Sequence, residues 1–236
     1  MNGALKLVRK QIKPEVYRAS VSKERYFYYI SSQWSLGSLH HQELELAKGY
    51  RNTLRKQEFL KGRYGVRQVI GANMPPLLKA SRGYPLWPIG WIGSISHKKG
   101  FVVFIVQPKS MEQNKSIGID LEEWKVPYRV VKRITNKDEI DLYHQLLQDF
   151  PFVGQKFLTT LFFSIKEAAF KCFSPVIKSE NFVLSDCKVM GIDLKTNTVR
   201  IEVSHQGLLA QDAQGWFQAV DLLDQMPCIV TVCEWK

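Results

Sequence analysis

The sequence of 236 residues predicts an α+β fold in which strands pair in an antiparallel manner. Two long stretches, residues 41–70 and 155–173, repeat apolar side chains with the period of a helix, and Pro175 is expected to end the second one. Beyond residue 182 the pattern changes to short runs of β-forming residues. A content of 45% hydrophobic and 12% aromatic residues is enough for a sizeable buried core.

In the first half, the helix at 41–70 is followed by a segment, 71–90, whose prolines and glycines exclude regular structure. The runs "WIGSIS" and "FVVFIV" at 91–96 and 101–106 predict two strands. The sequence "HKKG" between them predicts a hairpin turn, because Gly100 accepts a positive φ.

The polar segment at 107–116 is the best candidate for a linker, and it predicts two domains, residues 1–112 and 113–236. "IGIDLEEW" then predicts a short strand. Asn136 and the acidic residues after it predict the start of a helix that extends to residue 150.

In the last part of the chain, "KVMGIDL" and "TVRIEVS" flank a turn, and "WFQAVDLL" and "CIVTVCEW" predict two further strands. The cysteines, Cys172, Cys187, Cys228 and Cys233, show no spacing typical of a metal site. We expect buried free thiols in a reducing compartment.

The net charge is +11, from 33 Lys and Arg against 22 Asp and Glu. This excess favours an anionic partner. The charge alone does not distinguish between nucleic acid, a membrane surface, a phosphorylated ligand and an acidic protein. No RNA-binding or zinc-finger signature is present, and the longest apolar run is too short to cross a bilayer. No apolar stretch follows the basic N-terminal segment, so we expect an unexported protein without membrane insertion.

Asp120 and Glu122 are two residues apart on a predicted strand, so both carboxylates leave the same face. Magnesium prefers such oxygen ligands. The alternative is a solvated strand edge. Glu123 points to the opposite face, where we expect it to be solvated.

On the predicted helix at 155–173, Ser164, Glu167 and Lys171 share a face away from the main apolar stripe. This arrangement directs a carboxylate and an amine to one region, although an ordinary surface ion pair would show the same spacing. Lys166 lies on another side, and we expect it to be a solvated charge.

His97 ends a strand next to Ser96 and is followed by two lysines, Lys98 and Lys99. Charge and several donors at one turn suit a phosphate group. The alternative is a turn histidine without a function.

Three motifs, "WPIGWIGSISH", "GIDLE" and "FSIKEAAFK", follow one another in this order. Their combination resembles the 4′-phosphopantetheinyl transferases of the Sfp type, most closely the branch of the enterobactin-type siderophore enzymes. The resemblance covers about residues 50–175. It implies two similar, pseudo-duplicated α+β lobes with coenzyme A in the cleft between them, the N-terminal lobe contacting the nucleotide and the C-terminal lobe holding the metal and the catalytic helix.

The resemblance also implies the roles of individual residues. Asp120, Glu122 and Glu167 would hold Mg²⁺ against the pyrophosphate of coenzyme A. Glu167 or a metal-polarised water would take the proton of the attacking serine, and Lys171 would contact the coenzyme and stabilise the leaving phosphate. The residues implied in binding the nucleotide part of coenzyme A are Arg55, Arg63, Lys79, Arg82, Ser96 and His97. Lys98 and Lys99 depart from the family pattern.

The implied reaction is attack by a serine of an apo acyl or peptidyl carrier protein on the phosphate that bears pantetheine, with release of adenosine 3′,5′-bisphosphate. Carrier proteins of this kind are acidic, so the charge of +11 would steer them to the enzyme. We expect a cytoplasmic monomer that does not bind nucleic acid. The alternatives are an enzyme dedicated to the fatty-acid carrier protein, a basic nucleic-acid-binding protein and a catalytically silent relative.

Overall fold

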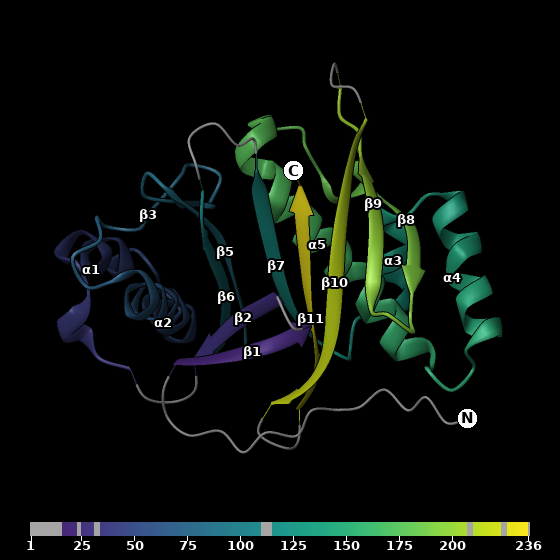
Figure 1. The fold of residues 1–236 in the computed structure, drawn as a ribbon, viewed down its shortest axis with the longest axis horizontal. Helices are drawn as coiled ribbons and strands as arrows, with labels where there is room; N and C mark the ends of the chain where they lie inside the picture. Colours follow the sequence, from purple (N-terminus) through teal and green to yellow (C-terminus); the bar gives the residue numbers. More distant parts are fainter. Residues whose placement is uncertain are drawn as a thin grey trace. The chain divides into compact units, whose positions relative to one another are not determined.

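The computed structural model of the protein describes residues 16–22, 25–30, 34–109, 115–206, 210–222 and 226–235, and it confirms the α+β class (Figure 1). These residues form two compact units, which divide between Ser116 and Ile117. The boundary predicted between residues 112 and 113 lies outside the described residues, as does the basic N-terminal segment. Within the described residues, no helix is both long and apolar enough to cross a membrane.

The N-terminal unit contains a four-stranded sheet in the order β1-β2-β6-β5, and the long helix α2 packs on β6. Val66 of α2 and Phe104 and Val106 of β6 form part of the core between them. The elements of this unit are β1 (Val16–Ser22), β2 (Arg25–Ile30), η1 (Leu36–Ser38), α1 (His41–Lys48), α2 (Thr53–Ile70), β3 (Leu78–Lys79), β4 (Pro85–Leu86), β5 (Trp91–Lys98) and β6 (Phe101–Pro108).

The predicted hairpin is confirmed, because β5 pairs antiparallel with β6 and Lys99 and Gly100 in its turn both have positive φ. The single helix predicted over 41–70 is wrong. It divides into α1 and α2, because the Asn52 side chain accepts a hydrogen bond from Arg55 N at 2.9 Å and starts a new helix. The segment 71–90 is also more regular than predicted, since β3 and β4 form a short antiparallel pair within it.

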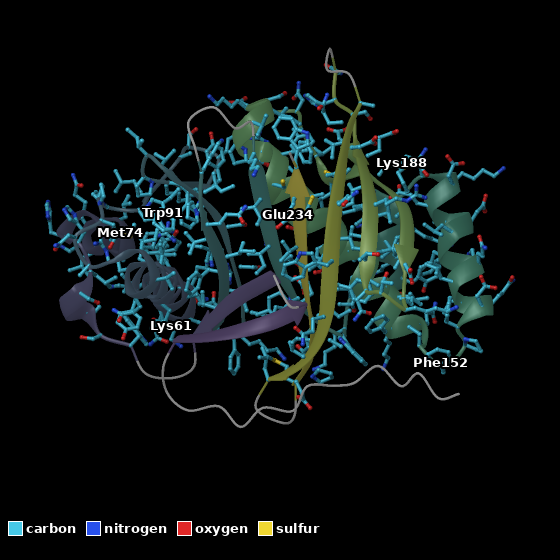
Figure 2. All side chains as sticks on the ribbon, in the orientation of Figure 1. Lys61, Met74, Trp91, Phe152, Lys188 and Glu234 are labelled. Atoms are coloured by element: carbon cyan, nitrogen blue, oxygen red, sulfur yellow. The ribbon has the colours of Figure 1, made fainter. Side chains whose placement is uncertain are left out.

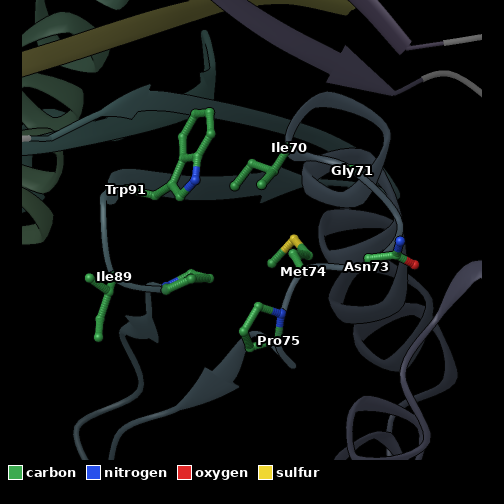
Figure 3. Close-up of a pocket in the computed structure, with 8 residues that line it drawn as sticks. Ile70, Gly71, Asn73, Met74, Pro75, Ile89 and Trp91 are labelled. Atoms are coloured by element: carbon green, nitrogen blue, oxygen red, sulfur yellow. The ribbon is translucent and has the colours of Figure 1, made fainter.

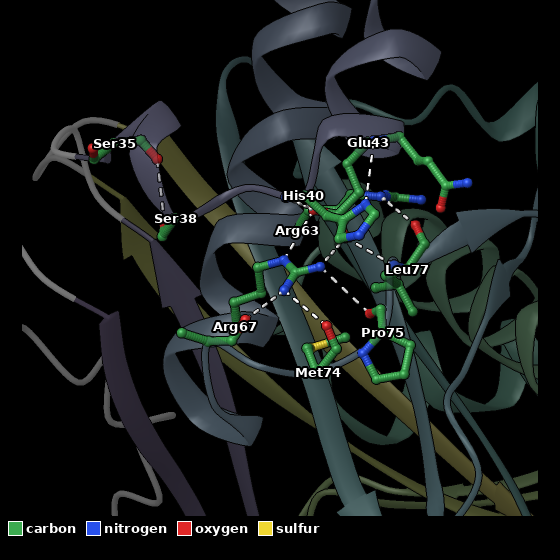
Figure 4. A network of polar contacts seen from close by, with 11 residues as sticks. Ser35, Ser38, His40, Glu43, Arg63, Arg67, Met74, Pro75 and Leu77 are labelled. Carbon is green, nitrogen blue, oxygen red and sulfur yellow. Dashed lines mark hydrogen bonds and ion pairs between the residues drawn. The ribbon is translucent and has the colours of Figure 1, made fainter.

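A buried carboxylate holds the segment after α2 in place (Figure 4). Glu43 of α1 is 0% exposed, and Arg67 of α2 binds it with Nε to Oε2 at 3.0 Å. Glu43 also accepts hydrogen bonds from the backbone nitrogens of His40 and Leu77 at 3.0 and 2.8 Å, while Arg67 donates to the carbonyl of Met74 at 3.0 Å. This fully paired network fixes the segment that leads into β3.

The C-terminal unit contains a five-stranded sheet in the order β7-β11-β10-β9-β8, and α5 packs on β11 and β8 (Figure 1). Strands β8 to β11 pair antiparallel with their neighbours, as predicted. The elements are β7 (Ser116–Glu123), α3 (Tyr128–Ile134), α4 (Lys137–Asp149), α5 (Gln155–Ile177), η2 (Leu184–Asp186), β8 (Cys187–Asp193), β9 (Thr198–Val203), β10 (Gln211–Leu222) and β11 (Met226–Trp235).

The starts of α4 and α5 follow the sequence, whereas α3 was not predicted and the end of α5 differs from the prediction. Asn136 caps α4 by accepting from Glu139 N at 3.0 Å, and the Glu139 side chain accepts from Asn136 N, which confirms the predicted start. Helix α5 continues past Pro175 to Ile177, because a proline in the last turn removes one hydrogen bond without ending the helix. Lys178, in the left-handed conformation, ends it.

Two charges expected to be solvated are buried instead. Lys166 is 0% exposed and binds Glu139 at 2.7 Å and the carbonyl of Cys187 at 2.6 Å. Because Glu139 also accepts from Val189 N at 2.8 Å, this pair joins α4 and α5 to the edge strand β8. Glu123 is 5% exposed and pairs with Lys125.

The cysteines and one surface ion pair complete the description of this unit. The four cysteines are buried and none is in a disulfide, as predicted. At the surface, Lys188 of β8 pairs with Asp138 of α4 at 3.0 Å (Figure 2).

Candidate functional site

The site in the C-terminal unit depends on direct contact between the backbones of β7 and α5. Gly118 of β7 makes this contact possible, because a Cβ atom built there would lie 1.9 Å from Ala168 O and 2.6 Å from Cys172 N. Only glycine allows a strand to approach a helix this closely. Since side chains alternate along a strand, Asp120 and Glu122 leave β7 on the same face as Gly118, toward α5.

Asp120 is the centre of this contact. It is 2% exposed, and Ser164 donates a hydrogen bond to its Oδ2 at 2.9 Å, while Lys171 donates to its Oδ1 at 2.5 Å. Ser164 is 0% exposed, whereas the Lys171 side chain is 27% exposed. A carboxylate with two such partners is held in one orientation and carries a balanced charge.

Glu167 lies between Ser164 and Lys171 on α5, so it projects from the face that meets Asp120. Glu167 and Glu122 are both partly exposed. Together with Asp120 these make three carboxylates, which come from the packed elements β7 and α5. Carboxylates are the donor type that a hard divalent cation prefers. Among the residues that the structure describes, no group of three or more His, Cys, Asp or Glu side chains is gathered for a metal ion.

In the N-terminal unit, three of the predicted cations gather around two aromatic rings. Tyr50 and Phe59 lie with ring centroids 5.1 Å apart. The Arg55 guanidinium and the Lys79 ammonium lie 5.9 and 5.6 Å from the Tyr50 centroid, and Arg63 stacks on Phe59 at 3.8 Å. A pocket of about 210 Å³ opens beside these rings, with Tyr50, Phe59 and Lys79 in its lining. This arrangement provides aromatic faces and positive charge at one surface.

Arg63 differs from the other two cations because it is only 5% exposed. Its Nε donates to the carbonyl of Leu77 at 3.2 Å. Burial lowers the pKa of Arg63 to about 10, so it remains charged at neutral pH. Arg63 is therefore a buried support of Phe59, which lines the pocket, and is not itself part of the lining.

His97 is held by a buried carboxylate that the sequence did not indicate. Glu58 of α2 is 5% exposed, and His97 Nδ1 donates to its Oε2 at 2.7 Å. The other oxygen, Oε1, accepts from Gly100 N at 2.8 Å, and Arg55 Nη1 lies 3.5 Å from Oε2. Glu58 thus fixes the ring of His97 and the β5–β6 turn together, and it brings Arg55 to the same place.

The remaining predicted residues, Ser96 and Arg82, have different surroundings. Ser96 is 4% exposed, and strand alternation places it on the opposite face of β5 from His97. Arg82 lies in the turn between β3 and β4 and is partly buried.

A second pocket of this unit, of about 340 Å³, is mainly apolar and is lined by Ile70, Gly71, Asn73, Met74, Pro75, Pro88, Ile89 and Trp91 (Figure 3). None of the residues predicted to form the site is in its lining.

Sequence reasoning missed Tyr50, Phe59 and Glu58. Phe59 and Glu58 stand inside "RKQEFLKGR", between Arg55 and Arg63, the two arginines of this segment that the resemblance assigns to coenzyme A. Tyr50 lies before α2, and only the chain reversal at residues 49–52 brings it onto Phe59.

Two family models match the chain. One describes the 4′-phosphopantetheinyl transferase N-terminal domain and matches residues 51–107, and the other describes the 4′-phosphopantetheinyl transferase superfamily and matches residues 116–221. The first region contains Arg55, Glu58, Phe59, Arg63, Lys79 and His97, and the second contains Asp120, Ser164, Glu167 and Lys171, whereas Tyr50 directly precedes the first.

Similar proteins carry names from the same family. Enterobactin synthase component D of Salmonella typhimurium is 29% identical over 150 residues, 61% of this chain and 57% of that protein. The 4′-phosphopantetheinyl transferase PptT of Mycobacterium tuberculosis is 30% identical over 130 residues, 52% and 53% of the two chains. Enterobactin synthase component D of Salmonella typhi is 26% identical over 188 residues, 76% and 72% of the two chains.

The matched part of the chain thus spans little more than half the length of the first two relatives. The two family models together cover most of the chain, on both sides of the boundary between the units. The chain therefore belongs to the 4′-phosphopantetheinyl transferase superfamily and is related to its enterobactin synthase branch.

Proposed function

We propose that this protein transfers the 4′-phosphopantetheine group from coenzyme A to a serine of an apo acyl or peptidyl carrier protein and releases adenosine 3′,5′-bisphosphate. The observation that supports it most is the contact of Asp120 with Ser164 and Lys171, within the region that matches the superfamily model. In this contact a fixed carboxylate lies beside a cation, and α5 carries Glu167 between the two residues that bind Asp120, which suits phosphoryl transfer by positioning and charge neutralisation.

In this reaction the serine oxygen of the carrier forms a bond to the phosphorus that bears pantetheine. The bond between that phosphorus and the bridging oxygen breaks, and the electron pair leaves with adenosine 3′,5′-bisphosphate. Glu167 accepts the serine proton, because it is a partly exposed carboxylate on the same face of α5. Lys171, also partly exposed, stabilises the charge on the leaving phosphate.

A magnesium ion is also part of the proposal, and Asp120, Glu122 and Glu167 would hold it. When bound, the ion would neutralise part of the negative charge on the pyrophosphate of coenzyme A. The carboxylate chemistry of these side chains and their position on two packed elements support this assignment, and binding would have to bring the three together, since they are not gathered as a metal site among the described residues.

The N-terminal unit supplies contacts to the nucleotide part of coenzyme A in this proposal. Tyr50 offers an aromatic face, and Arg55 and Lys79 beside it offer charge for phosphates. His97, fixed by Glu58, offers a further polar contact. Arg63 and Arg82 complete the set, with Arg63 chiefly supporting the pocket, whereas Ser96, buried on the face of β5 opposite His97, would act only by supporting that strand.

An acidic carrier protein is the partner that the net charge of +11 favours, because opposite charge speeds encounter. We place the reaction in the cytoplasm, since four buried thiols outside any disulfide suit a reducing compartment. We expect the protein to act as a monomer and without nucleic acid.

The experiment that tests the proposal is incubation of the purified protein with coenzyme A, Mg²⁺ and a panel of apo carrier proteins from fatty-acid, polyketide and peptide synthesis. Intact mass spectrometry should show the gain of one phosphopantetheinyl group on at least one carrier. If no carrier gains mass with metal present, the proposed activity is wrong. DNA or RNA binding with a steep salt dependence and no turnover would instead favour the nucleic-acid alternative.

Two carboxylate variants separate the proposed roles. Asp120→Asn should depress turnover and raise the Mg²⁺ concentration needed for half-maximal rate, so that excess Mg²⁺ restores part of the rate. Glu167→Gln should lower kcat without comparable rescue, because an amide cannot accept the serine proton. Asp141→Asn, which changes an exposed carboxylate of α4, is the matched control and should leave turnover unchanged. Equal rescue of both variants would reduce Glu167 to a metal ligand.

The nucleotide contacts are tested by the affinity for coenzyme A. Arg55→Ala and His97→Ala should each weaken binding about tenfold to a hundredfold, because charge-assisted hydrogen bonds contribute about 1.5–3 kcal/mol. Arg51→Ala, at an exposed position before α2, is the control. Unchanged affinity by calorimetry in both variants would remove these two residues from the site.

A further inference from the structure

Three polar side chains of the C-terminal unit form a hydrogen-bonded chain that the proposed transferase site does not use. Ser179 follows the end of α5, Asp186 ends η2, and His205 follows β9. His205 Nε2 lies 2.8 Å from Ser179 Oγ, and His205 Nδ1 lies 3.0 Å from Asp186 Oδ2. A hydroxyl, an imidazole and a carboxylate are thus joined in the order of a serine nucleophile, its general base and the group that orients the base.

The direction of both hydrogen bonds depends on the tautomer of His205. In the tautomer that carries its hydrogen on Nδ1, the ring donates to Asp186 and its Nε2 accepts from the Ser179 hydroxyl. Ser179 Oγ also accepts from Asn181 N at 3.3 Å, which favours negative charge on that oxygen. The ring of Phe182 packs edge-on against His205 at 5.6 Å and restricts its rotation.

A pocket lies beside His205 and Asp186. It measures about 250 Å³ and is lined by Asn181, Asp186, Ser204, His205 and Gln206, and Ser179 adjoins this lining through its contact with His205. The His205 side chain is 8% exposed, and the Asp186 side chain is 24% exposed. A small cavity with a polar lining accommodates a short acyl group, and the side-chain amides of Asn181 and Gln206 are suitable donors to a developing oxyanion.

We propose that Ser179, His205 and Asp186 form a second reactive site, at which Ser179 attacks short-chain activated acyl esters. Ser179 Oγ bonds to the acyl carbon, its proton passes to His205 Nε2, and the leaving alcohol or phenol takes that proton as the carbon–oxygen bond breaks. Water then attacks the acyl-serine by the same proton route and releases the carboxylic acid. This site is independent of the transferase activity, because it shares no residue with Asp120, Glu167 or Lys171.

The test uses the full-length protein and a fluorophosphonate, which forms a phosphonyl bond to an activated serine and releases fluoride. Peptide mass mapping should place a single label on Ser179. Ser179→Ala should abolish the label, and Asp186→Asn, which keeps an acceptor for Val183 N, should slow labelling at least about a hundredfold. The rate of p-nitrophenyl acetate hydrolysis should likewise be highest in the wild type, lower in Asp186→Asn and absent in Ser179→Ala.

Ser185→Ala is the matched control, since Ser185 is exposed in the same short helix η2 as Asp186. It should label at the wild-type rate. Mapping of the wild-type label needs no variant, so a variant that fails to fold does not obscure the answer. Absence of a label on wild-type Ser179, or labelling that Asp186→Asn leaves unchanged, would overturn the proposal. Carrier modification by Ser179→Ala at the wild-type rate is expected.

Discussion

Replacing Gly118 by alanine is the sharpest test of how the fold positions Asp120. The added Cβ would lie 1.9 Å from Ala168 O and 2.6 Å from Cys172 N. Both atoms belong to the backbone of α5, so no side-chain rotation relieves the overlap. Because contacts of a real Cβ below 3.0 Å essentially never occur, α5 and β7 must separate by about 1 Å.

That separation affects stability and the site together. Forcing an extra methyl group into a packed core costs about 1–3 kcal/mol. A movement of about 1 Å also stretches the bonds from Ser164 and Lys171 to Asp120, now 2.9 and 2.5 Å, and a charge-assisted hydrogen bond contributes about 1.5–3 kcal/mol. We therefore expect Gly118→Ala to lower the free energy of unfolding by about 3–5 kcal/mol.

Urea unfolding followed by circular dichroism measures this loss. Gly191→Ala in β8 is the matched control, because its Cβ would meet only the flexible side chain of Arg200, at 3.4 Å or more. We expect the control to change the free energy of unfolding by less than about 1 kcal/mol. A Gly118→Ala protein as stable as the control would show that β7 and α5 do not meet as described.

Two further predictions concern buried ionisable groups. Lys166→Met should destabilise the protein by about 3–5 kcal/mol in urea unfolding, because it leaves Glu139 buried without its cation. Adding Glu139→Gln to the same chain should recover part of that loss, whereas losses of the two single variants that simply add in the double variant would contradict a direct pair. Burial raises the pKa of the Cys187 thiol, so only the unfolded chain ionises it above about pH 8.5, and the wild type should lose about 1.4 kcal/mol per pH unit there relative to Cys187→Ala. Parallel stability curves of the two proteins between pH 7.5 and 9.5 would refute this sign.

The strand and helix that carry the motifs could be predicted because each pattern is local. The period of apolar residues at 155–173 and the strand "GIDLEE" depend only on neighbouring residues, and both elements are present. The break at residues 49–52 was missed, because the helical period continues across it and only Asn52 as a cap starts a new helix.

The sequence misled where a charge has a partner far along the chain. Lys166 and Glu139 are separated by a loop and belong to different helices, and no local pattern distinguishes a paired buried lysine from a solvated one. Glu123 sits on a strand whose two faces are both covered, so alternation of polar and apolar residues did not apply.

The sequence by itself determined the α+β class, the hairpin at residues 97–100 and the family, because motif spacing and turn chemistry are written in consecutive residues. Only the tertiary structure decided that Ser164 and Lys171 bind Asp120, that Glu58 holds His97, and that Tyr50 and Phe59 stand among the predicted cations. These contacts join different elements of a unit, and their distances follow from how closely elements pack. At Gly118 that packing rests on the absence of a single Cβ atom, which a sequence pattern records as a glycine without saying what it touches.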